Sequence, residues 1–209
     1  MPEARPAGPR RERVVARASR RQRRFVVAVI GDGEATSAAE RLAAAVGRGI
    51  VERGCRLVTG GLGGVMAAAS RGAHRARGYR EGDVIGILPG GDGDAANPWV
   101  DVAVPSGLGV ARNVLVVQAA DAVIAIGGRA GTLSELALAW QLGRPVVALD
   151  VPGWSARVAG RAIDDRRCDV VLRARDAGEA VALATAGLGA RRRGRAGRGG
   201  DPGSSRRGS

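Results

Sequence analysis

Apolar runs alternate with amphipathic stretches through the middle of this 209-residue chain. The run FVVAVI at 25–30 has no polar position, which is typical of a strand buried on both faces of a parallel sheet. Shorter segments of similar character follow at fairly regular intervals. The predicted strands are 25–30, 56–59, 83–88, 100–104, 122–126, 145–149 and 168–172.

The segments between these strands have the spacing of amphipathic helices. The first opens on Ser37 and Glu40, which match a helix-capping box, and ends at Gly54. The predicted helices are about 37–54, 65–76, 110–119, 133–142 and 177–188. Strands separated by helices predict an α/β fold in a single domain, with a doubly wound, mostly parallel, Rossmann-like sheet.

Both ends of the chain lack this periodicity and carry the excess positive charge. Residues 1–24 hold nine Arg against two Glu, and residues 191–209 hold seven Arg against one Asp. The segment between them has 17 Arg and 17 Asp plus Glu, so its net charge is zero. We therefore expect a folded domain over 25–188, flanked by disordered basic tails at 1–24 and 189–209. Such tails would bind nucleic acid weakly, without sequence preference and in a salt-sensitive manner.

Composition excludes several kinds of chemistry. The chain has no lysine, which rules out a pyridoxal phosphate decarboxylase and an ordinary P-loop ATPase. His74 is the single histidine, so we expect no metal site and no histidine-based nucleophilic triad. The isolated thiols Cys55 and Cys168 and the lack of a secretory or membrane segment indicate a cytoplasmic protein.

Two glycine-rich turns connect a predicted strand to a helix. The first is Gly60-Gly61-Leu-Gly63-Gly64, and the second runs from Gly127 to Thr132. Gly31 ends the first strand and lies at the same edge of the predicted sheet. Such turns bring bare N–H groups and a helix N-terminus together, which suits a phosphate. The alternative is that the glycines serve only tight packing of strand against helix.

Arg112 and Glu135 flank the second turn and are the candidate chemical groups. An Arg in the first turn of a helix opposes the helix dipole, so helix stability does not explain Arg112. A surface salt bridge is the alternative for that residue. Thr132 and Glu135 also match a capping box, in which Glu135 would only satisfy the N-terminus of its helix.

Several of these motifs, in this order, resemble the LOG-like Rossmann superfamily. That superfamily includes the cytokinin-activating phosphoribohydrolases called LOG and the molybdenum-cofactor carrier proteins. The similarity covers roughly 25–150. The matching motifs are TGG-LGGVM at 59–66, VIGILPG at 84–90, ARN at 111–113, DAVIAIGG at 121–128 and AGTLSE at 130–135.

The resemblance implies roles for individual residues. The LOG hallmark PGGxGTxxE, with an Arg about two dozen residues earlier, is matched by Gly128, Gly131, Thr132, Glu135 and Arg112. It implies that Gly131 and Thr132 hold a phosphate while Glu135 and Arg112 act on the ribose. Gly127 stands in place of the hallmark Pro, which together with the ARN and TLSE motifs is closer to the carrier proteins, and Arg129 stands in place of the second hallmark Gly. Arg129 either clasps the phosphate or blocks a nucleotide.

We therefore expect a protein that binds a small phosphorylated ligand, either a nucleotide or a molybdopterin-type cofactor, and that requires no further cofactor. The alternative is an enzyme that hydrolyses a nucleoside 5′-monophosphate through an oxocarbenium-like transition state. A third hypothesis is a nucleic-acid-associated protein acting through its Arg-rich tails.

The predicted helix 133–142 has apolar residues almost all round, including Leu138 and Trp140. A helix that covers one face of a sheet needs only an apolar stripe. We therefore expect a homodimer with Trp140 at or near the interface, as the resemblance also implies. The alternative is that residues 151–154 and the C-terminal helix cover this face within one chain.

Overall fold

The computed structural model describes residues 23–189, so most of each predicted tail lies outside the described residues. Within 23–189, seven strands form one sheet in the order β4-β3-β2-β1-β5-β6-β7, and every neighbouring pair is parallel. The strands are β1 (Val26–Gly31), β2 (Arg56–Thr59), β3 (Val84–Leu88), β4 (Val102–Pro105), β5 (Ala122–Ile126), β6 (Val146–Leu149) and β7 (Leu172–Ala174).

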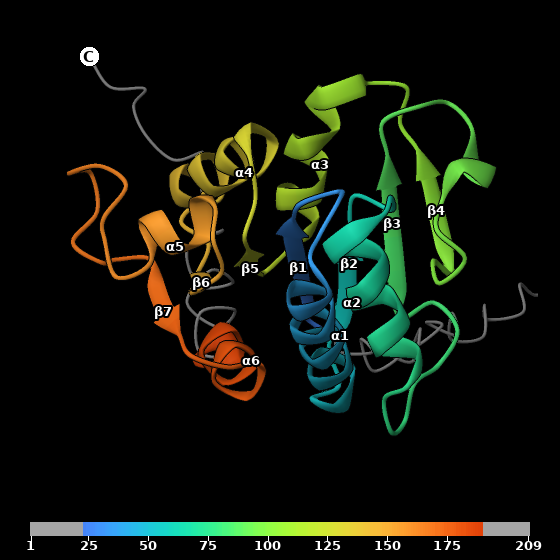
Figure 1. Cartoon of the computed structure of the whole chain (residues 1–209), viewed down its shortest axis with the longest axis horizontal. Coiled ribbons are helices and arrows are strands. Elements are labelled where there is room, and N and C mark those ends of the chain that lie inside the picture. The colour runs from blue at the N-terminus through green and yellow to red at the C-terminus, as the bar shows by residue number, and fades with distance from the viewer. Residues whose placement is uncertain (1–22, 190–209) are drawn as a thin grey trace, which may run out of the picture.

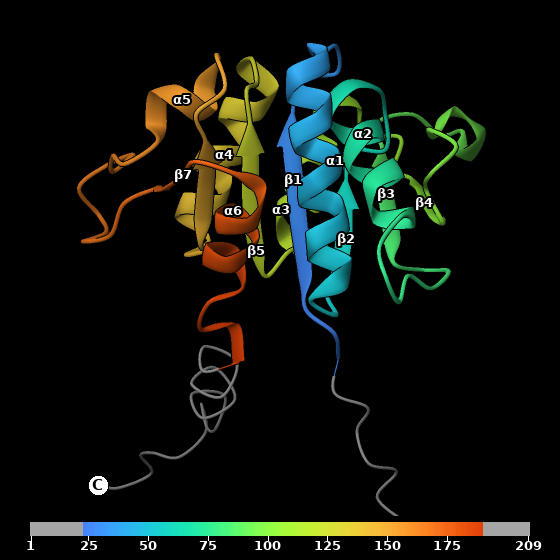
Figure 2. The same ribbon diagram turned by 60° about the horizontal axis from the view of Figure 1, so that its bottom comes forward.

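Helices cover both faces of this sheet (Figure 1). The helices are α1 (Ser37–Glu52), α2 (Gly64–His74), α3 (Arg112–Ala119), α4 (Ala130–Gln141), α5 (Trp154–Val158) and α6 (Ala177–Thr185), with 3-10 turns η1 (Gly93–Ala95) and η2 (Gly109–Ala111). α1, α2 and α6 pack on one face, and α3, α4 and α5 pack on the other (Figure 2). The predicted doubly wound Rossmann-like α/β fold is confirmed.

β1 is the point at which the direction of winding reverses. The chain proceeds from β1 through β2 and β3 to β4 on one side, and then returns to place β5 on the other side of β1. In open parallel sheets the connections after the strands diverge at such a switch point and leave a crevice for a ligand. Here, the turns that leave β1, β2 and β5 meet at this edge.

Three predicted local features were wrong in detail. α1 is capped by Thr36, whose hydroxyl accepts from the Ala39 N–H, so Ser37 and Glu40 do not form the predicted capping box. The last strand lies at Leu172–Ala174 rather than at 168–172. α4 begins at Ala130, three residues before the prediction, because Gly127 and Gly128 adopt positive φ and the chain turns into the helix directly after them.

The folded part includes residues that were assigned to the N-terminal tail. Arg24 donates to the Asp83 carboxylate and to the backbone carbonyls of Gly54 and Cys55. These contacts fix the entry into β1. No helix in 23–189 is both long and apolar enough to cross a lipid bilayer.

Candidate functional site

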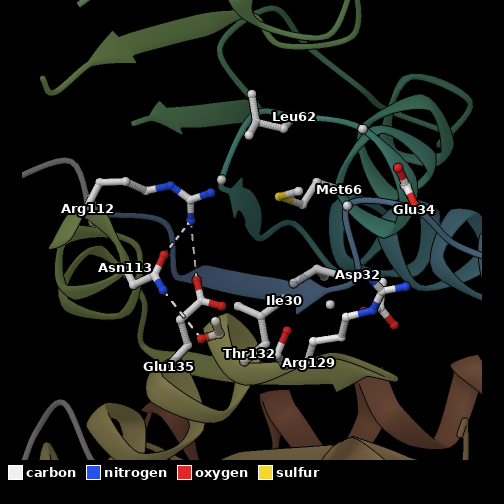
Figure 3. Close-up of a pocket in the computed structure, with 16 residues that line it drawn as sticks. Ile30, Asp32, Glu34, Leu62, Met66, Arg112, Asn113, Arg129, Thr132 and Glu135 are labelled. Atoms are coloured by element: carbon white, nitrogen blue, oxygen red, sulfur yellow. Dashed lines mark hydrogen bonds and ion pairs between the residues drawn. The ribbon is translucent and has the colours of Figure 1, made fainter. Parts of the chain in front are cut away.

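A cavity of about 500 Å³ lies over the carboxyl end of β1, between the turns that follow β2 and β5. Its size is within the range of small-molecule sites, which is about 300–1,000 Å³. Apolar side chains, among them Ile30, Leu62 and Met66, form one part of its wall, and glycines with polar and charged side chains form the rest (Figure 3). The cavity therefore has an apolar surface for a ring and polar groups that can orient it.

The glycines of the first two turns are needed for close packing. A methyl group on Gly31 would lie 2.8 Å from Val65 Cγ1, at the start of α2. A methyl group on Gly60 would lie 2.6 Å from Arg112 Cζ, so Gly60 makes room for the Arg112 guanidinium. Gly64 has a φ of +59° and packs on the Gly33 backbone. The glycines of these turns thus allow α2 and the Arg112 side chain to pack closely against the neighbouring chain.

The second glycine turn is held in place from outside the cavity. Ser155 is fully buried; its hydroxyl accepts from the Gly127 N–H at 2.7 Å and donates to the Leu149 carbonyl at 2.7 Å. The Trp154 N–H donates to the Gly128 carbonyl at 2.9 Å. Gly127 and Gly128 have φ of +64° and +102°, which residues with a side chain rarely adopt. The turn that leads into α4 is therefore fixed before any ligand arrives.

Arg112 and Glu135 meet inside the cavity. Arg112 Nη1 lies 3.5 Å from Glu135 Oε1 and donates to Asn113 Oδ1 at 2.8 Å. Both residues are buried, at 9% and 6% exposure. The Arg112 Nε–H is also buried and has no hydrogen-bond partner within the described protein. Arg112 is thus not part of a surface salt bridge, and its Nε–H has no acceptor among residues 23–189.

Burial controls the ionisation of this pair. Loss of solvent raises the pKa of Glu135 to about 7, although the nearby Arg112 charge acts in the opposite direction. Loss of solvent also lowers the pKa of Arg112, an effect that Glu135 partly offsets. Near neutral pH, Glu135 therefore exchanges a proton readily, which is useful for both binding and acid–base chemistry.

The capping-box interpretation of Glu135 was wrong. Thr132 lies inside the first turn of α4 rather than before it, and Arg129 occupies the N-cap position without a side-chain cap. Glu135 lies one turn further on and contacts Arg112 on α3. Thr132 is 4% exposed and lines the cavity (Figure 3).

The structure brings most of the predicted site residues together. The cavity is lined by Gly31, Gly60, Gly63, Arg112, Arg129, Gly131, Thr132 and Glu135. The other four predicted residues support the turns from behind the lining. These are Gly61, Gly64, Gly127 and Gly128. A ligand- or phosphate-binding role for ten of these residues, and a catalytic role for Arg112 and Glu135, stay predictions.

Sequence reasoning missed three polar residues that line the cavity, Asp32, Glu34 and Asn113. Asn113 donates to the Gly131 carbonyl at 3.3 Å and to Ser134 Oγ at 3.0 Å, so it ties α3 to α4. Asp32 accepts from the Gly128 N–H at 2.9 Å and lies 3.7 Å from Arg129 Nε. Asn113 lies in the ARN motif and Asp32 in the turn after β1. The sequence around each residue does not predict its hydrogen-bond partner.

Comparison with known proteins places this fold and site in a family. The model of the SLOG cluster4 family matches residues 24–181, and the chain belongs to that family. An uncharacterized protein of Archaeoglobus fulgidus is 42% identical over 126 residues, which are 60% of this chain and 80% of that protein. The expected membership of the LOG-like superfamily is confirmed.

Two solved structures resemble the whole folded part. The molybdenum cofactor binding protein of Rippkaea orientalis is 36% identical, with a TM-score of 0.68 over 78% of this chain and 96% of its own. The molybdenum cofactor carrier protein of Chlamydomonas reinhardtii is 30% identical, with a TM-score of 0.68 over 80% of this chain and 99% of its own. The predicted similarity to the carrier branch is thus confirmed.

Proposed function

We propose that this protein binds the molybdenum cofactor, a phosphorylated pterin, in the cavity over β1 and serves as its carrier. The observation that carries the proposal is the buried Arg112–Glu135 pair. Both residues line a cavity of about 500 Å³, and the buried Arg112 Nε–H has no hydrogen-bond partner among the described residues. The similarity over nearly the full length of two proteins named for the same cofactor supports this choice of ligand.

The residues around the cavity suit the two ends of such a ligand. The first-turn N–H groups of α4 have no partner within the helix and, together with the Thr132 hydroxyl, provide donors for a phosphate. Arg112 and Glu135 provide a donor and an acceptor for the polar atoms next to it. Ile30, Leu62 and Met66 provide an apolar surface for the ring system.

Calorimetric titration with the molybdenum cofactor under anaerobic conditions tests this proposal. We expect saturable binding to the wild-type protein and about tenfold weaker binding to Thr132→Val, which keeps the shape but loses one hydrogen bond. Thr185→Val, which removes a hydroxyl on α6 at the opposite face, is the matched control and should bind like wild type. No heat of binding at millimolar cofactor would end the proposal.

A second candidate function is hydrolysis of a nucleoside 5′-monophosphate to a free base and ribose 5-phosphate. Glu135 favours it, because a carboxyl group with a pKa of about 7 beside a guanidinium can stabilise a developing oxocarbenium ion when ionised. In this reaction, water adds to the ribose C1′, the bond to the base breaks and the base leaves with a proton.

Chromatography of AMP incubated with the protein distinguishes the two functions. A carrier releases no adenine, whereas a hydrolase releases adenine and ribose 5-phosphate in equal amounts. If adenine appears, the Glu135→Gln variant should lose at least about 100-fold in rate. Unchanged turnover in that variant would eliminate this mechanism.

A further inference from the structure

One backbone N–H of the second glycine turn, which could bind an anion, already donates to a carboxylate of the chain itself. The Gly128 N–H donates to Asp32 Oδ2 at 2.9 Å. The Asp32 side chain is 22% exposed and lines the cavity, so it lies where the turn opens toward a ligand. A phosphate that approaches Gly131 and Thr132 therefore meets a negative charge.

Arg129 lies beside this carboxylate but is held only loosely. Its Nε is 3.7 Å from Asp32 Oδ1, and its side chain is 82% exposed. Exposed ion pairs of this kind contribute at most about 1 kcal/mol, so the pair exchanges readily for a stronger partner. Arg129 also stands at the N-terminus of α4, where a cation opposes the helix dipole, so helix stability does not explain it.

A second guanidinium group lines the cavity on its other side. Arg112, nine-tenths buried on the other side of the cavity, has an Nε–H without a partner in the described protein. Figure 3 shows two sets of polar side chains apart: Arg112, Asn113 and Glu135 on one side, Asp32 and Arg129 on the other. The cavity thus has a guanidinium group on each side, each beside a carboxylate, and Glu34 adds a third carboxylate to the lining.

We propose that Arg129 is a phosphate-binding residue that exchanges Asp32 for the phosphate of the ligand, while Asp32 limits the affinity and promotes release. The inference rests on the proposed carrier function. A guanidinium binds a phosphate dianion through two parallel hydrogen bonds, more strongly than it binds a carboxylate at 3.7 Å. Asp32 stays on the Gly128 N–H and repels the bound phosphate, a useful property in a carrier that has to release its cargo.

Inorganic phosphate, compared with chloride at equal ionic strength, tests the exchange independently of the rest of the ligand. The readout is the rise in Tm of the full chain with phosphate concentration, because binding to the folded state raises Tm. For Arg129→Gln we expect an apparent phosphate affinity about tenfold lower than that of wild type. For Asp32→Asn, which keeps an acceptor for the Gly128 N–H, we expect an affinity about tenfold higher.

The matched control is Arg48→Gln, which removes the same charge from the exposed surface of α1 and should respond like wild type. An equal phosphate response of wild type and Arg129→Gln would overturn the proposal. So would an affinity of Asp32→Asn no higher than wild type, or a wild-type Tm that does not respond to phosphate.

Titration with the molybdenum cofactor then separates this inference from the carrier function. If the cofactor binds wild type and Arg129→Gln equally, the inference fails while the carrier function stands. If phosphate responses follow the expected order but the cofactor does not bind, the carrier function fails while the exchange at Asp32 stands. Dissociation of the cofactor should be slower from Asp32→Asn than from wild type.

Discussion

At the scale of single residues, Gly60 in the first glycine turn determines where the Arg112 guanidinium can lie in the cavity. A Cβ at this position would lie 2.6 Å from Arg112 Cζ and Nη1, so alanine would displace the guanidinium. We expect Gly60→Ala to weaken ligand binding by at least about tenfold, the effect of one lost charge-assisted hydrogen bond. Calorimetry measures this effect.

Gly91→Ala is the control for that substitution, because nothing lies within 4 Å of a Cβ at Gly91 in the loop after β3. It should bind like wild type. If Gly60→Ala also binds like wild type, Arg112 does not contact the ligand.

Glu135 links the cavity to the pH dependence of folding. Burial raises its pKa from 4.5 to about 7, so between these pH values the folded state holds a proton that the unfolded state has released. The contribution of Glu135 to stability therefore falls as pH rises from 4.5 through 7. Glu135→Gln does not titrate, and its stability relative to wild type should increase by about 2 kcal/mol from pH 5 to pH 8.

Urea denaturation of both proteins at the two pH values gives this difference. Equal changes in the two proteins would show that Glu135 is already ionised at pH 5 in the folded state.

At the scale of elements, α5 supports the second glycine turn although it contributes nothing to the cavity lining. Ser155 bonds Gly127 and Leu149 from a fully buried position. We expect Ser155→Ala to lower the free energy of unfolding by about 1–3 kcal/mol, because the Gly127 N–H loses its partner. Ligand affinity should fall as well, since the turn before α4 loosens.

Ser70→Ala is the comparison for Ser155, because the Ser70 hydroxyl is equally buried but donates only to Met66 in its own helix. Ser70→Ala should lower the free energy of unfolding by less than Ser155→Ala does, and it should leave ligand affinity unchanged. A Ser155→Ala protein that binds with wild-type affinity would show that the turn does not need this support.

The elements themselves could largely be predicted from the sequence. The unbroken apolar runs identified the central strands, because a parallel sheet covered on both faces excludes polar side chains there. α5 could not be predicted, because five residues carry too little periodicity. The start of α4 was placed late because Thr132 and Glu135 imitate a capping box, whereas the conformation of Gly127 and Gly128 sets the boundary.

The site could be predicted in part. Glycine turns after successive strands located the cavity, and the position of Arg112 against the helix dipole marked it as unusual. Asp32, Asn113 and Ser155 could not be found, because each acts on a residue far away in sequence. Asp32 bonds Gly128, 96 positions away, and nothing in the local sequence encodes that pairing.

At the scale of the whole molecule, the premise behind an interface at Trp140, an exposed Leu/Trp pair on α4, was wrong. Trp140 is 2% exposed, packs among residues of α4 and the segment after β6, and donates to Asp164 at 2.8 Å. The segment after β6 therefore covers this face within one chain, as the alternative held, whereas α6 packs on the opposite face of the sheet.

A homodimer stays a prediction, but another surface suits it better. Six of the exposed apolar side chains lie within residues 102–115, from β4 to the first half of α3: Val102, Val104, Leu108, Val110, Val114 and Leu115. Val110 is 88% exposed and lies two residues before Arg112. Large apolar patches on a protein surface usually mark interfaces, and we predict that these side chains form one. A second copy seated here would lie next to the cavity.

Light scattering on the full chain tests the dimer. We expect twice the chain mass of 21.3 kDa for wild type and a shift toward the single-chain mass for Val110→Arg. Val170→Arg, at an exposed valine just before β7, should leave the mass unchanged. A wild-type mass of one chain at all concentrations would rule out the dimer.

The most direct test of the central claim is a crystal structure of the protein with the molybdenum cofactor bound. We predict the ligand in the cavity over β1, with its phosphate about 3 Å from Thr132 Oγ1 and its other polar atoms facing Arg112 and Glu135. A cofactor bound outside this cavity, or inside it with the phosphate away from α4, would contradict the account.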